Sequence, residues 1–486
     1  MLTDTTPSHT GLDARPLNTR YRQWGGYPGG KAQTRLLRYT FDLTEVVADH
    51  ATLDLFAESR YQLWINGTFV SRGPVMQHPH RPYFDSREIS NHLRVGRNVI
   101  CVLVHYAGIS LHNHIPTCWP GLVGRLLVDT TEIIHERSVW KMTTETGWSD
   151  QVPRRSWAID FIEVFDQAQH PMGWTSPFYD DSGWDQSETI DTGQDLHAMD
   201  HHVPLLKAVW KPAELIACYG VTGDIHAIHP DHDTADFGRC LAEEPYEAIS
   251  LEAGTLPLVV DAKRDKGLVI IADLGAAYSG HPRFVLDTKS GGSIDFGWGE
   301  MLVDDRPGVS RKGASYANRI TVQSGTCEWM SQAYNCGRYL LFALRGFEGQ
   351  VTIRELGMVE TTPDVPWYPP MCSSDDRLDA IYSLCMRTLR VGTQECMTDC
   401  PTREQALYLG DSAFSGRWFY WLTGNPHHWR HLLEETFAAQ SPYGQLKSTC
   451  FSGSYGILLD YSLIGVISLR DYVRETGEVS FGRKWY

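Results

Sequence analysis

The hydrophobic pattern of this chain changes its period once, at a proline-rich stretch, and this change limits the possible folds more than any other feature. Before the stretch, short apolar runs alternate with turn residues, as in Tyr61–Ile65, Asn66-Gly67 and Thr68–Val70. Asn-Gly accepts the positive φ angles of a tight hairpin turn, so this segment predicts a β-hairpin. Prolines then punctuate residues 363–370, and the apolar spacing that follows is helical.

Two β-rich segments are expected before the boundary. The first covers residues 35–245 and the second covers 246–366, where Leu268–Asp273 and Ser293–Glu300 have the composition of strands. No helical period separates the strands of the second segment, so we predict two successive β-sandwich domains. Residues 1–34 are polar and rich in Gly, Pro and Thr, and we expect them to form a flexible tail.

Four helices are expected in a third domain over residues 367–486. Their expected positions are a helix that starts at the capping box Ser373–Asp376 and runs through Leu389, then 411–423, 428–440 and 457–476. Gly424 and Gly477 are the residue type that commonly ends a helix. The last helix is apolar almost all round, so we expect it to be buried on most sides.

Charge and cysteine content exclude several classes of protein. Among 486 residues, 43 are basic and 59 are acidic, giving a formal charge of −16. This sign argues against a nucleic-acid partner and against docking on an anionic membrane. No apolar run is long enough to span a membrane or resembles a signal peptide, and eleven cysteines, an odd number, indicate reduced thiols in a cytoplasm.

The motifs of nucleotide-binding loops, of serine hydrolases and of zinc proteases are absent from the sequence. We therefore expect no cofactor. Three pairs of histidines lie close in the sequence: His78 and His80, His112 and His114, and His201 and His202. None has a third ligand at recognisable spacing, so we interpret them as packed or surface side chains and expect no metal site.

One segment concentrates ionisable groups: Asp399-Cys-Pro-Thr-Arg-Glu-Gln-Ala-Leu-Tyr-Leu-Gly-Asp411. Its proline favours a loop between the first two helices of the third domain. Three carboxyls and Arg403 lie within thirteen residues, and such crowding separates pKa values. Glycoside hydrolysis needs a protonated carboxyl and an ionised one. From these residues alone, a solvated acidic loop with an Arg403 ion pair remains the alternative.

This segment resembles the active-site signature of bacterial α-L-rhamnosidases, glycoside hydrolase family 78. Arg470–Gly477 resembles a later helix of the same catalytic domain, and Phe296–Glu300 and Tyr334–Tyr339 resemble its concanavalin-like sandwich. Trp64–Gly67 resembles its N-terminal sandwich, so the resemblance extends from about residue 35 to the end. It implies two β-sandwiches followed by an (α/α)6 six-hairpin barrel, and an inverting hydrolase that removes terminal α-L-rhamnose from a rhamnose-containing glycoside.

The resemblance also implies roles for five residues. Glu404 corresponds to the general acid. Asp399 and Asp411 correspond to carboxylates that hold sugar hydroxyls and tune the acid, and Arg403 corresponds to a group that helps to hold the sugar. Tyr408 stands where the family often has a tryptophan that packs on the sugar, so the aromatic face is kept but is smaller.

The chain departs from the family in length. A barrel of twelve helices needs more than roughly 200 residues, whereas 112 residues follow Ser374. We therefore expect a partial barrel, with the family's general base beyond Tyr486. A chain without that base should hydrolyse poorly, and helices without their neighbours should expose apolar faces.

Two other functions remain open from the sequence. A six-hairpin hydrolase for another deoxy or uronic sugar would suit the change at Tyr408. A non-catalytic carbohydrate-binding fragment would use the sandwiches, and the sixteen tryptophans suit either large β-sheet cores or sugar stacking. The aglycone and the oligomeric state are not determined by the sequence.

Overall fold

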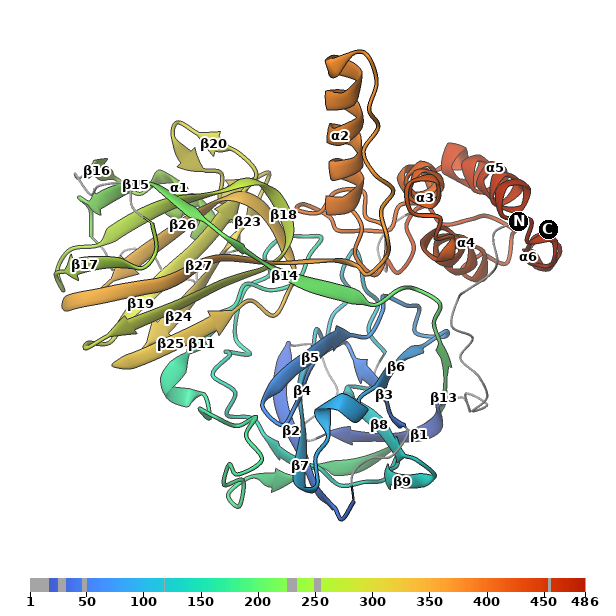
Figure 1. The fold of residues 1–486 in the computed structure, drawn as a ribbon, viewed down its shortest axis with the longest axis horizontal. Coiled ribbons are helices and arrows are strands. Elements are labelled where there is room, and N and C mark those ends of the chain that lie inside the picture. The colour runs from blue at the N-terminus through green and yellow to red at the C-terminus, as the bar shows by residue number, and fades with distance from the viewer. Residues whose placement is uncertain are drawn as a thin grey trace.

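The computed structural model describes residues 17–24, 32–45, 50–117, 119–224, 234–248, 255–452 and 456–485. Two β-rich units and a smaller helical unit meet at a common junction (Figure 1). The expected architecture, two β units followed by part of a six-hairpin helical domain, is confirmed, and the described helices form no closed barrel.

The first β unit packs two six-stranded sheets face to face. One sheet has the order β1 (Leu17–Trp24), β13 (Glu188–Asp200), β6 (Tyr83–Glu88), β3 (Ala51–Glu58), β8 (Gly121–Val128), β9 (Thr131–Ile134). The other has the order β12 (Asp185–Gln186), β10 (Lys141–Thr143), β2 (Gln33–Leu43), β7 (Gly96–Tyr106), β4 (Arg60–Ile65), β5 (Thr68–Gly73).

The alternation of β7 explains how this sandwich is filled. Ile100, Val102 and Val104 point into the core between the two sheets, where they join side chains of β3, β4 and β8. Val99 and Leu103 point to the opposite face, which a loop carrying Trp174 covers. The predicted hairpin is confirmed as β4 and β5, and its turn residues Asn66 and Gly67 have φ angles of 52° and 87°.

The second β unit is built on one eleven-stranded sheet. Its main path is β11 (Val164–Asp166), β24 (Ala317–Val322), β19 (Gly292–Gly299), β26 (Asn335–Arg345), β18 (Leu268–Thr288), β15 (Glu214–Val221), β16 (Tyr246–Ala248). Four further strands extend it: β14 (Leu206–Pro212), β17 (Leu258–Ala262), β25 (Gly325–Met330) and β27 (Gly349–Pro363). Two small hairpins flank it, β20–β21 (Leu302–Val303, Arg306–Pro307) and β22–β23 (Ser310–Arg311, Ala314–Ser315).

The long strand β18 joins the two halves of this sheet. Its first part pairs with β15 and β26, and its last part pairs with β25 and β27. The core between the halves is aromatic, because Phe284, Phe296, Trp329 and Phe342 are all buried and in ring contact. A sandwich-like unit with a large aromatic core accounts for part of the high tryptophan content.

Sheet membership differs from the expected segmentation in two places. Strands β11, β14 and β15 belong to the sheet of the second β unit although they lie within residues 35–245, whereas β12 and β13 between them belong to the first unit. Residues 17–24, which we expected within a flexible tail, form β1 and pair with β13. Residues 1–16 and 25–31 of the expected tail lie outside the described residues. Alternation along a strand indicates which of its faces is buried, but not which strand it pairs with.

The helical unit follows β27 and contains α2 (Asp376–Val391), α3 (Leu409–Thr423), α4 (His427–Ala438), α5 (Leu459–Thr476) and α6 (Val479–Trp485). The four predicted helices are confirmed with small shifts at their ends. Gly424 and Gly477 have φ angles of 71° and 78°, and each N–H completes the last turn of its helix. The N-cap of α2 is Asp375, whose carboxylate accepts the Arg377 N–H. A further helix, α1 (Thr234–Glu243), lies in the β-rich region.

Helices α3 to α6 pack together around Trp429, whereas α2 stands apart from them (Figure 1). No side chain of α2 is buried. The expectation that the last predicted helix is buried on most sides is wrong: α5 buries Leu469 and Tyr472, but Leu459, Leu463 and Val466 are exposed. A helix that is apolar on every face can be buried on every face, but neighbouring elements cover only part of α5.

Candidate active site

The acidic signature forms a loop between α2 and α3, as its proline predicted. The loop closes on itself, because the Asp399 N–H donates to the Ala406 carbonyl at 2.9 Å and the Gln405 N–H donates to the Cys400 carbonyl at 3.1 Å. The second β unit supports it from outside: Thr402 Oγ1 donates to Glu300 at 3.1 Å. Glu300 ends the Phe296–Glu300 segment, so this sandwich motif contacts the signature directly.

Glu404 is buried at the base of this loop, with 7% of its surface exposed. Arg403 forms an ion pair with Oε1 of the Glu404 carboxyl. The Tyr408 hydroxyl donates a hydrogen bond of 2.6 Å to Oε2. Both carboxyl oxygens are therefore held in place. The Arg403 ion pair of the alternative interpretation is present, but Glu404 itself is buried and not solvated.

The two aspartates of the signature lie in different surroundings. Asp399 is half-buried, and burial raises its pKa; the nearby Glu404 charge acts in the same direction, while the Cys400 thiol and the Ala406 N–H donate to the carboxylate and oppose the rise. Asp411, in the first turn of α3, is exposed and accepts a hydrogen bond of 2.8 Å from the Tyr461 hydroxyl. The rise in the pKa of Asp399 thus comes mainly from burial, and the neighbouring Glu404 charge adds to it.

Tyr408 does not present its ring as an open platform. It is 8% exposed, and its hydroxyl is bonded to Glu404. An exposed indole lies close by instead: Trp157, with 54% of its surface exposed, from the segment that precedes β11. The ring centroids of Trp157 and His112 are 5.0 Å apart, and those of His112 and Tyr408 are 5.4 Å apart.

Sequence reasoning missed His112 as part of this site. It is 1% exposed, and its Nε2 lies 2.8 Å from the Tyr408 hydroxyl and 3.7 Å from Glu404 Oε2. Our interpretation of it as a packed histidine is correct but incomplete. The only signal in the sequence was its position in a loop rich in histidine, and nothing in that loop points to residues 296 positions away.

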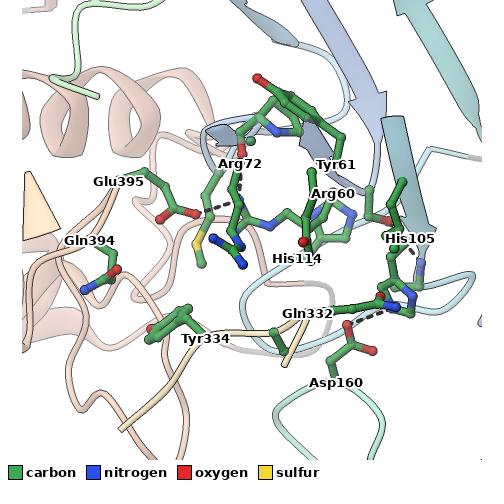
Figure 2. Close-up of a pocket in the computed structure, with 18 of the residues that line it drawn as sticks. Arg60, Tyr61, Arg72, His105, His114, Asp160, Gln332, Tyr334, Gln394 and Glu395 are labelled. Carbon is green, nitrogen blue, oxygen red and sulfur yellow. Dashed lines mark hydrogen bonds and ion pairs between the residues drawn. The ribbon is translucent and has the colours of Figure 1, made fainter. Parts of the chain in front are cut away.

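A cavity of about 160 Å³ lies at the junction of the three units. Figure 2 shows side chains from the first β unit facing Gln332 and Tyr334 of the second, and Gln394 and Glu395 of the α2–α3 loop. Arg60 pairs with Glu395 across it at 2.5 Å. Gln405 lines this cavity but Glu404 does not, so the acid lies outside this cavity.

The described residues contain no group of three or more His, Cys, Asp or Glu side chains placed to hold a metal ion. Ten cysteines fall within the described ranges and form no disulfide there. None of the helices in those ranges is both long and apolar enough to cross a membrane.

The part of the chain that carries this site matches a known family model. Residues 370–462 match the family model of the bacterial alpha-L-rhamnosidase 6 hairpin glycosidase domain. This stretch holds α2, the signature loop, α3 and α4. Among curated protein sequences, none matches the chain.

Solved rhamnosidase structures share the fold over nearly the whole chain. The GH78 family rhamnosidase of Bacillus sp. GL1 superimposes with a TM-score of 0.84 at 20% identity, covering 96% of this chain and 68% of that one. The alpha-L-rhamnosidase from Dictyoglumus thermophilum gives a TM-score of 0.65 at 17% identity, covering 96% and 49%. The Streptomyces avermitilis alpha-L-rhamnosidase complexed with L-rhamnose gives 0.63 at 16%, covering 92% and 42%.

The chain therefore has the fold of family 78 α-L-rhamnosidases, and the resemblance found in the sequence is confirmed. It spans about two thirds of the Bacillus protein and half or less of the other two.

Proposed function

We propose that this chain carries the acid side of an inverting glycoside hydrolase site that removes terminal α-L-rhamnose, with Glu404 as the general acid. The observation that supports the proposal best is the Glu404 carboxyl, which is buried and held at both oxygens within the segment that matches the rhamnosidase family model. A general acid needs such a fixed orientation toward the departing glycosidic oxygen.

The neighbouring groups suit the roles that the resemblance implies. Arg403 is 43% exposed at its side chain while it pairs with Glu404, so its guanidinium can reach both the acid and a bound sugar. Asp411 is exposed and oriented by Tyr461, which suits a carboxylate that accepts hydrogen bonds from sugar hydroxyls. Asp399 adds a carboxyl with a raised pKa beside the acid.

Inversion also needs a base that activates water, with the two carboxyl groups roughly 6.5–9.5 Å apart. The resemblance places that base far downstream of the signature, and we propose that none of residues 1–486 supplies it. Turnover by this chain should then be slow, since general-base assistance contributes typically about 10²- to 10⁴-fold. We also keep a cytoplasmic location as a proposal, on the odd number of cysteines.

Hydrolysis of an aryl α-L-rhamnoside, measured with wild type and E404Q, tests the proposal. We expect E404Q to lower the rate by about 10²- to 10⁴-fold, while the binding of L-rhamnose, measured by calorimetry, persists. E395Q is a matched control in the same loop, because Glu395 faces Arg60 in the junction cavity and should leave the rate per folded molecule unchanged.

Two results would contradict the proposal. Cleavage of another deoxy or uronic glycoside in preference to the rhamnoside would identify a different six-hairpin hydrolase. Binding of rhamnosylated glycans by both forms, with equal or no hydrolysis, would identify a carbohydrate-binding protein.

A further inference from the structure

A loop of the first β unit reaches into the helical unit and delivers His112 to the signature. The loop follows β7, and the His112 N–H donates to the Ala158 carbonyl at 2.8 Å, so two loops of the β-rich region are tied together at this point. The imidazole is almost fully buried against the Trp157 ring. The helical unit contributes Tyr408 on one side of it and Ser452 on the other.

The direction of the hydrogen bonds around His112 follows from the number of hydrogens available. Tyr408 has one hydroxyl hydrogen, which points to Glu404 Oε2 at 2.6 Å. Toward His112 Nε2, at 2.8 Å, the same oxygen must accept, so Nε2 carries a hydrogen. A neutral ring then leaves Nδ1 as an acceptor for the Ser452 hydroxyl at 3.3 Å.

Burial favours the neutral form of this ring. It lowers the pKa of His112, although the nearby Glu404 charge acts in the opposite direction. Neutrality matters for the geometry, because an uncharged ring with its hydrogen on Nε2 can donate to the Tyr408 hydroxyl and accept from the Ser452 hydroxyl through Nδ1. Nε2 also lies 3.7 Å from Glu404 Oε2.

We propose that His112 is a positioning residue for Glu404: it holds the Tyr408 hydroxyl in place, and Tyr408 in turn fixes the orientation of the acid. The inference rests on the proposed function and extends the site beyond the helical unit. The contacts Ser452–His112–Tyr408–Glu404 form one continuous chain of hydrogen bonds across the boundary between the β-rich and helical units. The helical unit alone would lack the imidazole that keeps its acid in one rotamer.

A double-mutant cycle on rhamnoside hydrolysis tests this arrangement. H112F removes the Nε2 donor and should lower kcat by about 10- to 100-fold, the cost of a misplaced acid, with KM changed less than about threefold. H112Q keeps an N–H donor at a similar reach and should restore most of the lost rate. In a Y408F background, H112F should have no further effect on kcat, because His112 acts through the Tyr408 hydroxyl.

The control for the loop is H114F, since His114 pairs with Glu58 and not with the signature. It should leave kcat unchanged for the folded fraction. Additive losses from H112F and Y408F, or a loss of rate matched by H114F, would show that His112 supports the fold only and would overturn the proposal.

Imidazole ¹⁵N NMR tests the same contacts without turnover, so failure of the rhamnosidase proposal can be told apart from failure of this one. At pH 7 the His112 ring should be neutral with its hydrogen on Nε2. Introducing E404Q into the wild-type chain should shift the His112 resonances, and introducing it into Y408F should not shift them. A charged ring, an Nδ1–H tautomer, or a shift that survives in Y408F would overturn the role of Tyr408 as the link.

Discussion

At the scale of single residues, Asp295 shows how the second β unit tolerates charge in its interior. Its carboxylate on β19 is fully buried and accepts hydrogen bonds from Arg319 at 2.6 and 2.7 Å and from Arg345 at 2.6 Å. Burial alone would raise the pKa of Asp295, but the two guanidinium groups outweigh it and lower the pKa. Arg345 also forms a bidentate pair with Glu244, with both contacts at 2.6 Å.

Removing the Asp295 charge should therefore destabilise the protein strongly. We expect D295N to lower the free energy of unfolding by about 3–5 kcal/mol, because it removes a buried ionised partner from both Arg319 and Arg345. The measurement is urea unfolding followed by tryptophan fluorescence. E348Q is the control, since Glu348 pairs with Arg264 at the surface with both side chains exposed, and such pairs contribute about 0–1 kcal/mol. Equal effects of the two variants would contradict the argument.

Tyr408 shows why a residue's role is hard to transfer by position. The sequence places an aromatic ring at the family's stacking position, but the structure buries that ring and bonds its hydroxyl to the acid. Trp157, distant in sequence, offers the exposed indole. Spacing within a motif could predict that Glu404, Arg403 and Tyr408 lie together, but it could not predict which of their side chains are buried and which are exposed.

At the scale of elements, three helices leave apolar side chains uncovered. On α2 these are Leu378, Ile381 and Leu384, all more than half exposed. The other two helices add a larger set: Phe414, Trp418 and Trp421 on α3, and Leu459, Leu463, Val466 and Ile467 on α5. The expectation that helices of this domain expose apolar faces is confirmed. Such surfaces favour association when nothing covers them.

The double variant I381E/L384E should reduce that tendency. We expect the purified chain to bind a hydrophobic dye and to self-associate in sedimentation experiments, and we expect both signals to fall in the variant because charge replaces an exposed apolar stripe. V259E, at an isolated exposed position on β17, should change neither signal. A wild-type chain that is monomeric and does not bind the dye would show that these faces are covered in solution.

At the scale of the whole molecule, the contact between the first β unit and α4 depends on buried ionisable groups. Glu435 of α4 accepts a hydrogen bond of 2.6 Å from Tyr83 and pairs with Arg81. Three buried histidines lie around this contact: His78, His428 and His431. Burial lowers the pKa of the first two to about 4 and of His431 to about 3, while burial raises the pKa of Glu435 to about 7.

These shifts predict that acid weakens this contact. Each histidine has a folded pKa below its ordinary value of 6.5, so its contribution to stability is present above pH 6.5 and is lost as the pH falls toward 4 or 3. Glu435 acts in the opposite direction between about pH 4.5 and 7. Between about pH 4.5 and 6.5, three histidines gain a proton on unfolding and one glutamate loses one, so the unfolded chain binds about two more protons than the folded chain. Each of these protons changes the free energy of unfolding by about 1.4 kcal/mol per pH unit.

Thermal unfolding between pH 7.5 and 4.5 measures this dependence. The midpoint should fall as the pH decreases, and H431M should flatten the curve because it removes one buried titrating ring while filling a similar volume. H135Q, at an exposed position, should leave the slope unchanged. A midpoint that rises on acidification would mean that the Glu435 contribution dominates.

The sequence by itself determined the elements and their order. The hairpin at Asn66-Gly67, the helix ends at Gly424 and Gly477, and the loop between α2 and α3 all depend on local φ, ψ preferences and apolar spacing, which neighbouring residues set. The thirteen-residue signature also predicted that Asp399 and Glu404 lie near each other, because the two are close along the chain.

Only the tertiary structure determined which distant segments of the chain contact each other. It assigned β11, β14 and β15 to the sheet of the second β unit, left α5 partly uncovered, and brought His112 to Tyr408 across 296 residues. Contacts of this kind depend on how whole units pack, and the free energy that selects them comes from burial summed over many side chains. This burial free energy cannot be read from a short stretch of sequence, so the position of His112 in the site became evident only from the folded structure.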